Sequence, residues 1–167
     1  MKRYKSYFNE DITIDFIPIL NKVVKSYISK NRDNNFFTGD CANFAEALFK
    51  FIQYNEIIYN LKEDKDYYIV TMSDNSVSHT VLFIKGKYID ASGINTKNQI
   101  KDKFATGDGK VVWEKDEGIY NNSGVSSTKI LNGLENEFEK FYPDLSSKLS
   151  EDITIPLSKG DTFFYGK

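Results

Sequence analysis

The sequence predicts one α+β domain, in which helices pack on an antiparallel sheet and further helices lie at both ends. Apolar residues recur at helical spacing near both ends of the chain. Runs of β-branched and aromatic residues, separated by short polar turns, occupy the middle. At 167 residues the chain is long enough for one hydrophobic core and short for two. A single domain over residues 1–167 is therefore expected.

The first third predicts two helices and a loop between them. Residues 12–29 have helical periodicity, with Pro18 near the front. Residues 31–40 are rich in Asn, Asp and Gly and predict a loop that ends in Asp40, a favoured N-cap residue. A second helix is expected over residues 41–54. One face of this helix is apolar and contains Cys41, Ala45, Leu48 and Ile52.

The middle of the chain predicts strands. Their composition is β-branched and aromatic, and they are expected at 67–72, 79–85, 87–91 and 110–115. The second and third of these form a hairpin around Lys85-Gly86. Helices are expected at 96–104 and 128–143, the latter ending at Pro143. The tail segments ITIP and TFFY are expected to add one or two edge strands.

Composition disfavours several classes of partner. The net charge is −2 with lysines and glutamates interspersed, so neither nucleic acid nor a membrane surface is expected as a partner. One cysteine and one histidine provide neither a disulfide nor a Cys/His zinc cluster, so no metal or other cofactor is expected. No signal peptide or transmembrane run is seen, which favours a cytoplasmic protein. The oligomeric state stays open.

The single cysteine, Cys41, stands at the predicted start of a helix. A helix N-terminus stabilises a thiolate through unpaired N–H groups and the helix dipole, and the thiolate is the reactive form of cysteine. Taken alone, Cys41 is better explained as a small buried hydrophobe. The single histidine, His79, opens an apolar strand and fits equally a core histidine. Asp90 lies between apolar neighbours in the next strand, and a buried carboxylate is costly without a partner.

The hairpin predicts such a partner for Asp90. A two-residue turn at Lys85-Gly86 places Val81 opposite Asp90 and Ser92 opposite His79. His79 and Asp90 are then diagonal neighbours on one face of the sheet, about 7–8 Å apart at the backbone. A loop of odd length would place them on opposite faces. Together with Cys41, they would form the nucleophile, base and orienting group that acyl transfer requires.

These residues resemble a known family. The stretches DCANFAEAL and SHTVLFIKGKYIDAS look like the catalytic core of the NlpC/P60 branch of the papain-like cysteine hydrolases, with transglutaminase-like and arylamine N-acetyltransferase relatives. The motif covers about residues 38–93, within a catalytic core expected over about 38–115. Two positions depart from the NlpC/P60 pattern: Ala42-Asn43 stands where Ser-Gly is usual, and Asp90 where His is most often found.

The resemblance implies a papain-like fold and a thiol-dependent hydrolase of amide or isopeptide bonds, acting on a protein or peptide. Cys41 would be the nucleophile, His79 the base and Asp90 the orienting residue, and Asn35 matches the offset of a papain-type oxyanion donor. An acyltransferase, transglutaminase or glutamine deamidase would use the same residues. The sequence is also compatible with an inert papain-like binding module, such as a phage or mobile-element inhibitor of a host protein, and with a hydrolase delivered by a virion or lysis system.

Overall fold

The computed structural model describes residues 16–37, 39–106, 110–116 and 125–143. In this part of the chain, four helices accompany a five-stranded antiparallel sheet, so the predicted α+β class is confirmed. The elements in chain order are α1 (Phe16–Lys30), α2 (Cys41–Tyr59), β1 (Tyr67–Ser73), β2 (Ser78–Ile84), β3 (Lys87–Asp90), β4 (Gly93–Asn95), α3 (Lys97–Phe104), β5 (Val112–Asp116) and α4 (Ser127–Phe141).

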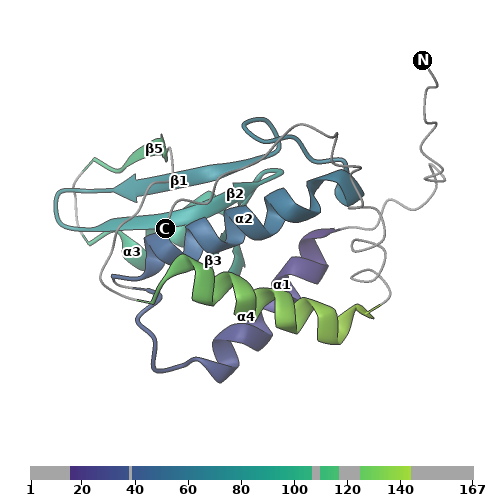
Figure 1. Ribbon diagram of the computed structural model, residues 1–167. Helices are drawn as coiled ribbons and strands as arrows, with labels where there is room; N and C mark the ends of the chain where they lie inside the picture. Colours follow the sequence, from purple (N-terminus) through teal and green to yellow (C-terminus); the bar gives the residue numbers. More distant parts are fainter. Residues whose placement is uncertain (1–15, 38, 107–109, 117–124, 144–167) are drawn as a thin grey trace, which may run out of the picture.

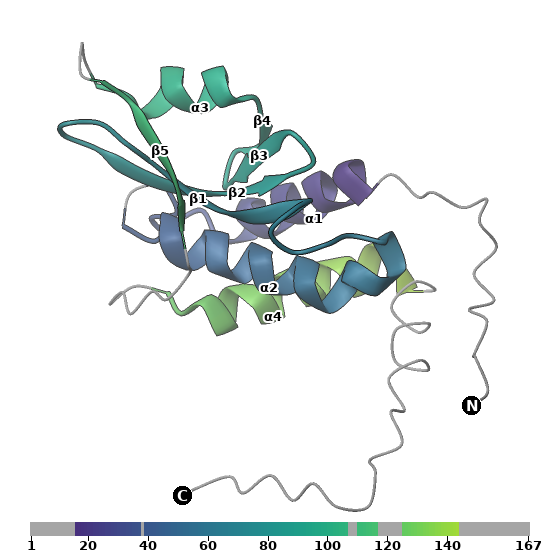
Figure 2. The same ribbon diagram turned by 90° about the horizontal axis from the view of Figure 1, so that it is seen from above.

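The helices form layers on the two faces of the sheet. The strand order is β4-β3-β2-β1-β5, and α1, α2 and α4 lie on one side of the sheet with α3 on the other (Figures 1 and 2). Alternate residues of β2 face opposite sides, as the pleat of a strand requires. Leu82 and Ile84 join Ile89 in the main core, while Val81 packs with Ile100 of α3 in a smaller one.

None of the helices in these described ranges has the length and apolarity needed to cross a membrane.

The hairpin between β2 and β3 has the predicted register. Ile84 pairs with Lys87 across a two-residue turn, in which Lys85 has φ 44° and Gly86 has φ 79°. Two consecutive residues with positive φ define a type I′ turn, whose twist matches that of the strands. The register therefore places His79 and Asp90 on the same face of the sheet.

Beyond Ile89 the structure does not contain the predicted pairs of Val81 with Asp90 and of His79 with Ser92. The paired residues of β2 and β3 end at Leu82 and Ile89, and the chain then turns through Ala91-Ser92 into β4, a strand that the sequence analysis missed. Ser92 is therefore not opposite His79. A three-residue strand has too few residues for its alternation to be recognised in the sequence.

Most predicted boundaries differ from those in the structure by one or two residues, and the end of α2 differs most. Helix α2 continues to Tyr59, five residues beyond the predicted end, and stops at Asn60, whose φ of 48° is left-handed. Within this extension the Asn55 amide donates to the Phe51 carbonyl at 2.7 Å, so a polar residue is accommodated inside the helix. Helix α1 is described from Phe16, and residues 12–15 of its predicted span lie outside the described residues. The strands predicted for the tail segments ITIP and TFFY also lie outside the described residues.

An aromatic cluster anchors the loop that leads into α2. Phe36 is 2% exposed, and its ring lies 5.1 Å from Phe44 of α2 and 5.9 Å from Tyr27 of α1, centroid to centroid. Full burial of such a ring stabilises the fold by roughly 1.5–3 kcal/mol. The loop is thus held to the core five residues before Cys41, which defines where α2 begins.

We expect Gly93→Ala to destabilise the fold by about 2–4 kcal/mol, because left-handed strain and overpacking act together there. Gly93 has φ 100°, and an added Cβ would lie 2.6 Å from Oδ1 of Asn21, which accepts the amide of Ile94. Urea denaturation measures the loss. Gly86→Ala is the matched control, because φ is 79° but the surrounding space is open, and about 1 kcal/mol is expected. Equal losses in the two variants would contradict the proposed clash.

Candidate functional site

Cys41 is the first residue of α2 and is only partly buried. The carbonyl of Asp40 accepts the amide of Phe44 at 2.9 Å, the first hydrogen bond of the helix, as the predicted helix start requires. Burial raises the pKa of the Cys41 thiol, but the interaction with His79 and the N–H groups of Thr80 and Ala42 more than offset it, so the pKa is lowered. The balance of these effects favours the thiolate.

His79 and Asp90 form a buried pair. Nε2 of His79 lies 3.2 Å from Oδ2 of Asp90, and the two residues are 1% and 2% exposed. Burial lowers the pKa of His79, yet the hydrogen bonds with Asp90 and Cys41 outweigh it and the pKa is raised. Burial raises the pKa of Asp90, and the bonds from His79 and Ser92 outweigh it, so the pKa is lowered. Imidazolium and carboxylate are therefore both favoured.

The second carboxylate oxygen of Asp90 is fully engaged. Oδ1 accepts the amide of Ser92 at 2.8 Å, its hydroxyl at 2.6 Å, and the side-chain amide of Asn95 at 3.0 Å. Asn95 also donates to the carbonyl of Gly93 at 2.8 Å and is 4% exposed. These donors come from the turn and strand that follow Asp90, so the local chain compensates the buried charge.

The imidazole of His79 bridges Asp90 and the thiol. Because Asp90 occupies Nε2, the interaction of the ring with Cys41 falls to Nδ1. Nδ1 is buried, and within the described ranges it has no hydrogen bond of ordinary length and angle. A catalytic hydrogen bond is often long or poorly aligned without substrate, so the absence of this bond is compatible with a role for Nδ1. The structure brings Cys41, His79 and Asp90 together in the predicted order.

An aromatic side chain covers this pair. The ring of Phe104, at the end of α3, stacks on the imidazole with 3.6 Å between centroids and 17° between planes. Phe37, in the loop before α2, is 43% exposed and lies 6.5 Å from Phe104, centroid to centroid. Sequence reasoning missed the contributions of Phe104 and Asn95, since nothing local to α3 or β4 marks them. Only the pairing of β3 with β4 brings Asn95 to Asp90.

Asn35 is exposed in the loop before α2. Its backbone carbonyl accepts the amide of Asp40 at 3.2 Å, which ties the loop to the helix start. The role of the Asn35 side chain as an oxyanion donor stays a prediction.

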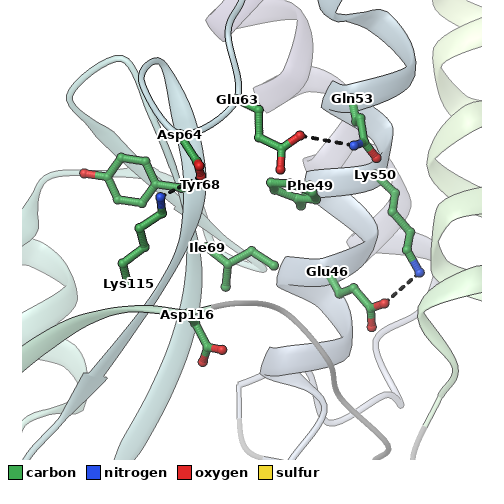
Figure 3. Close-up of a pocket in the computed structure, with 10 residues that line it drawn as sticks. All are labelled: Glu46, Phe49, Lys50, Gln53, Glu63, Asp64, Tyr68, Ile69, Lys115 and Asp116. Atoms are coloured by element: carbon green, nitrogen blue, oxygen red, sulfur yellow. Dashed lines mark hydrogen bonds and ion pairs between the residues drawn. The ribbon is translucent and has the colours of Figure 1, made fainter.

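A separate cavity of about 580 Å³ lies between α2 and the strands β1 and β5 (Figure 3). Phe49 and Ile69 form part of its lining. Other lining residues form ion pairs, such as Glu46 with Lys50, whose Oε1 and Nζ atoms lie 2.6 Å apart. Cys41, His79 and Asp90 are not among the residues that line it. These three residues are the better candidate for chemistry, because a partly exposed thiol and an imidazole interact there. The carboxylates that line the cavity are instead engaged with amines, an amide or a hydroxyl.

The described part of the chain holds no group of three His, Cys, Asp or Glu side chains placed to bind a metal ion. Comparisons with protein-family models, with curated proteins and with solved structures find no match to this chain.

We expect iodoacetamide to label Cys41 at neutral pH faster than it labels a free cysteine. The lowered thiol pKa means that the thiolate forms below the ordinary value of about 8.5, so its fraction at pH 7 is larger. In His79→Ala the effect of burial remains and the favourable partner is lost, so labelling at pH 7 should slow by roughly tenfold. Mass spectrometry over a pH series gives the rates, and every signal belongs to Cys41 because the chain has one cysteine. Labelling only in urea would contradict an activated thiol.

Proposed function

We propose that the chain is a papain-like, thiol-dependent hydrolase that cleaves amide or isopeptide bonds through an acyl-enzyme intermediate. Cys41 serves as the nucleophile, His79 as the acid and base, and Asp90 as the residue that orients the imidazole. The observation that carries the proposal is the arrangement of His79. Nε2 is held by a buried carboxylate, Nδ1 has no hydrogen-bond partner among the described residues, and the ring interacts with a partly exposed thiol at a helix start. A buried histidine with a purely structural role would have both nitrogens satisfied.

In the first half of the reaction, the Cys41 thiolate attacks the acyl carbon and the carbonyl oxygen becomes an oxyanion. Unpaired N–H groups in the first turn of α2 would receive that charge. The imidazolium of His79 then gives its Nδ1 proton to the departing amine as the bond between carbon and nitrogen breaks. A thioester on Cys41 and a free amine result.

In the second half, a water molecule replaces the amine. Neutral His79 takes a proton from this water, the hydroxide adds to the thioester, and the thiolate of Cys41 leaves as the carboxylic acid forms. Throughout, Asp90 keeps its negative charge and accepts a hydrogen bond from the Nε2–H group of His79. The buried carboxylate thereby stabilises the imidazolium and selects the tautomer whose Nδ1 faces the thiol.

The cavity beside α2 supports a protein or peptide as substrate. Its nearest residue on that helix, Glu46, follows Cys41 by five positions, about 7.5 Å along the helix axis. A polypeptide bound at the thiol would extend along α2 into this cavity, where ion pairs and the apolar surface of Phe49 offer contacts (Figure 3). The acceptor of the acyl group, water or an amine, decides between a hydrolase and an acyltransferase.

A second candidate is a binding module that keeps the fold without turnover. The stacking of Phe104 on His79, together with the 1% exposure of the imidazole, favours it, because a leaving group must reach Nδ1. Acylation of the thiol by a small activated ester decides between the two functions, since such an ester needs little room.

We expect p-nitrophenyl acetate to acylate Cys41 and release nitrophenol in a burst. In Asp90→Asn this burst should slow by about 10²- to 10⁴-fold, because an amide neither stabilises the imidazolium nor selects the productive tautomer. Stopped-flow absorbance and intact mass measure the acyl-enzyme, and thermal melting of the same sample measures its stability.

Cys41→Ala is the control and should show no burst. A structural carboxylate predicts a different pattern for Asp90→Asn: a loss of roughly 1–3 kcal/mol of stability with unchanged acylation per folded molecule. That pattern would remove Asp90 from the reaction. A wild-type chain whose thiol is never acylated would favour the binding module.

A further inference from the structure

The last turn of α3 places a cation next to the residues that hold Asp90. Nζ of Lys103 lies 2.6 Å from Oδ1 of Asn95 and 2.7 Å from Oγ of Ser92. Both of these residues donate to Oδ1 of Asp90. Lys103 is thus linked to the imidazole of His79 by a chain of hydrogen bonds that passes first through Ser92 or Asn95 and then through Asp90. The resemblance to papain-like enzymes does not extend to this helix.

A lysine ammonium can donate hydrogen bonds but cannot accept them. Asn95 must therefore turn its oxygen toward Lys103 and its NH₂ group toward Asp90. The reversed amide would put NH₂ against the ammonium and oxygen against the carboxylate, and both contacts would be repulsive. Ser92 is constrained in the same way, because its oxygen accepts from Lys103 and its one proton remains for Asp90.

The orientation of the Ser92 and Asn95 donors also determines which oxygen of Asp90 contacts His79. With three donors on Oδ1, the carboxylate of Asp90 presents Oδ2 as the acceptor for the imidazole. A proton is therefore favoured on Nε2 of His79, and Nδ1 is left to serve the thiol. The charged and titratable groups around the imidazole then come from three elements: Cys41 from α2, Asp90 from β3 and, through its partners, Lys103 from α3.

We propose that Lys103 is a positioning residue, which fixes the donor direction of Asn95 and Ser92 and thereby the orientation and tautomer of His79. The inference rests on the proposed function, in which His79 acts on Cys41. The adjacent Phe104 stacks on the same imidazole. The last turn of α3 therefore holds the ring both through its polar partner and across its flat face.

The single histidine of the chain makes the test direct. Long-range ¹H–¹⁵N NMR of ¹⁵N-labelled full-length protein reports the tautomer and titration of His79 alone. Wild type should carry its proton on Nε2 in the neutral form. Lys103→Met should yield a mixture of tautomers, because Asn95 and Ser92 lose the ammonium that fixes their oxygens and hold Oδ1 of Asp90 less firmly. Labelling of Cys41 by iodoacetamide at pH 7 should slow by about three- to tenfold.

Two variants isolate the role of the ammonium. Lys101→Met removes the same charge from an exposed position of the same helix and should behave as wild type. Lys103→Arg keeps a cationic donor and should restore most of the wild-type tautomer. A Lys103→Met spectrum and labelling rate that match those of Lys101→Met would overturn the inference, because a structural lysine affects only the melting temperature.

Failure of the proposed function has a different signature. If wild type shows the Nε2 tautomer and Lys103→Met shifts it, Lys103 positions His79 even when no ester acylates Cys41. If Cys41 is acylated but the tautomer is the same in Lys103→Met and Lys101→Met, the function stands and the role of Lys103 is overturned.

Discussion

The buried carboxylate of Asp90 is the constraint on which the arrangement of the site depends. An ion removed from water loses several kcal/mol of hydration, and the protein must replace it with hydrogen bonds of good geometry. Asp90 meets this demand with three donors on one oxygen and the imidazole of His79 on the other. The turn after β3, the short strand β4 and the end of α3 all contribute to that shell. The region around the hairpin is thus organised around one charge.

The same charge connects elements that are far apart in the chain. Asp90 favours the protonated form of His79, and the imidazolium in turn favours the thiolate of Cys41, so the effect crosses from the sheet to α2. This coupling needs α2 to begin at a defined place. The burial of Phe36 beside Phe44 secures the preceding loop to the core. Hydrophobic packing therefore sets the position of the nucleophile, and electrostatics sets its ionisation.

The cover over the imidazole bears on both candidate functions. Stacking of Phe104 on His79 excludes water from the flat face of the ring, which strengthens its electrostatic interactions with Asp90 and Cys41. The same cover restricts access to Nδ1. Cys41 itself is only partly buried, so its residue surface is in part open to a ligand. Among the exposed large apolar side chains of the described residues, Phe37 is the nearest to Cys41 along the sequence.

The sequence by itself determined the α+β class, the start of α2 at Cys41, and the proximity of His79 and Asp90. These follow from local rules: helical and strand periodicity, an N-cap residue, and a two-residue turn whose length defines the register. Strand β4, the longer α2, the shell formed by Ser92 and Asn95, and the contacts from α3 were decided only by the tertiary structure. No short-range pattern encodes them, because a donor is useful to Asp90 only where the packing of separate elements places it.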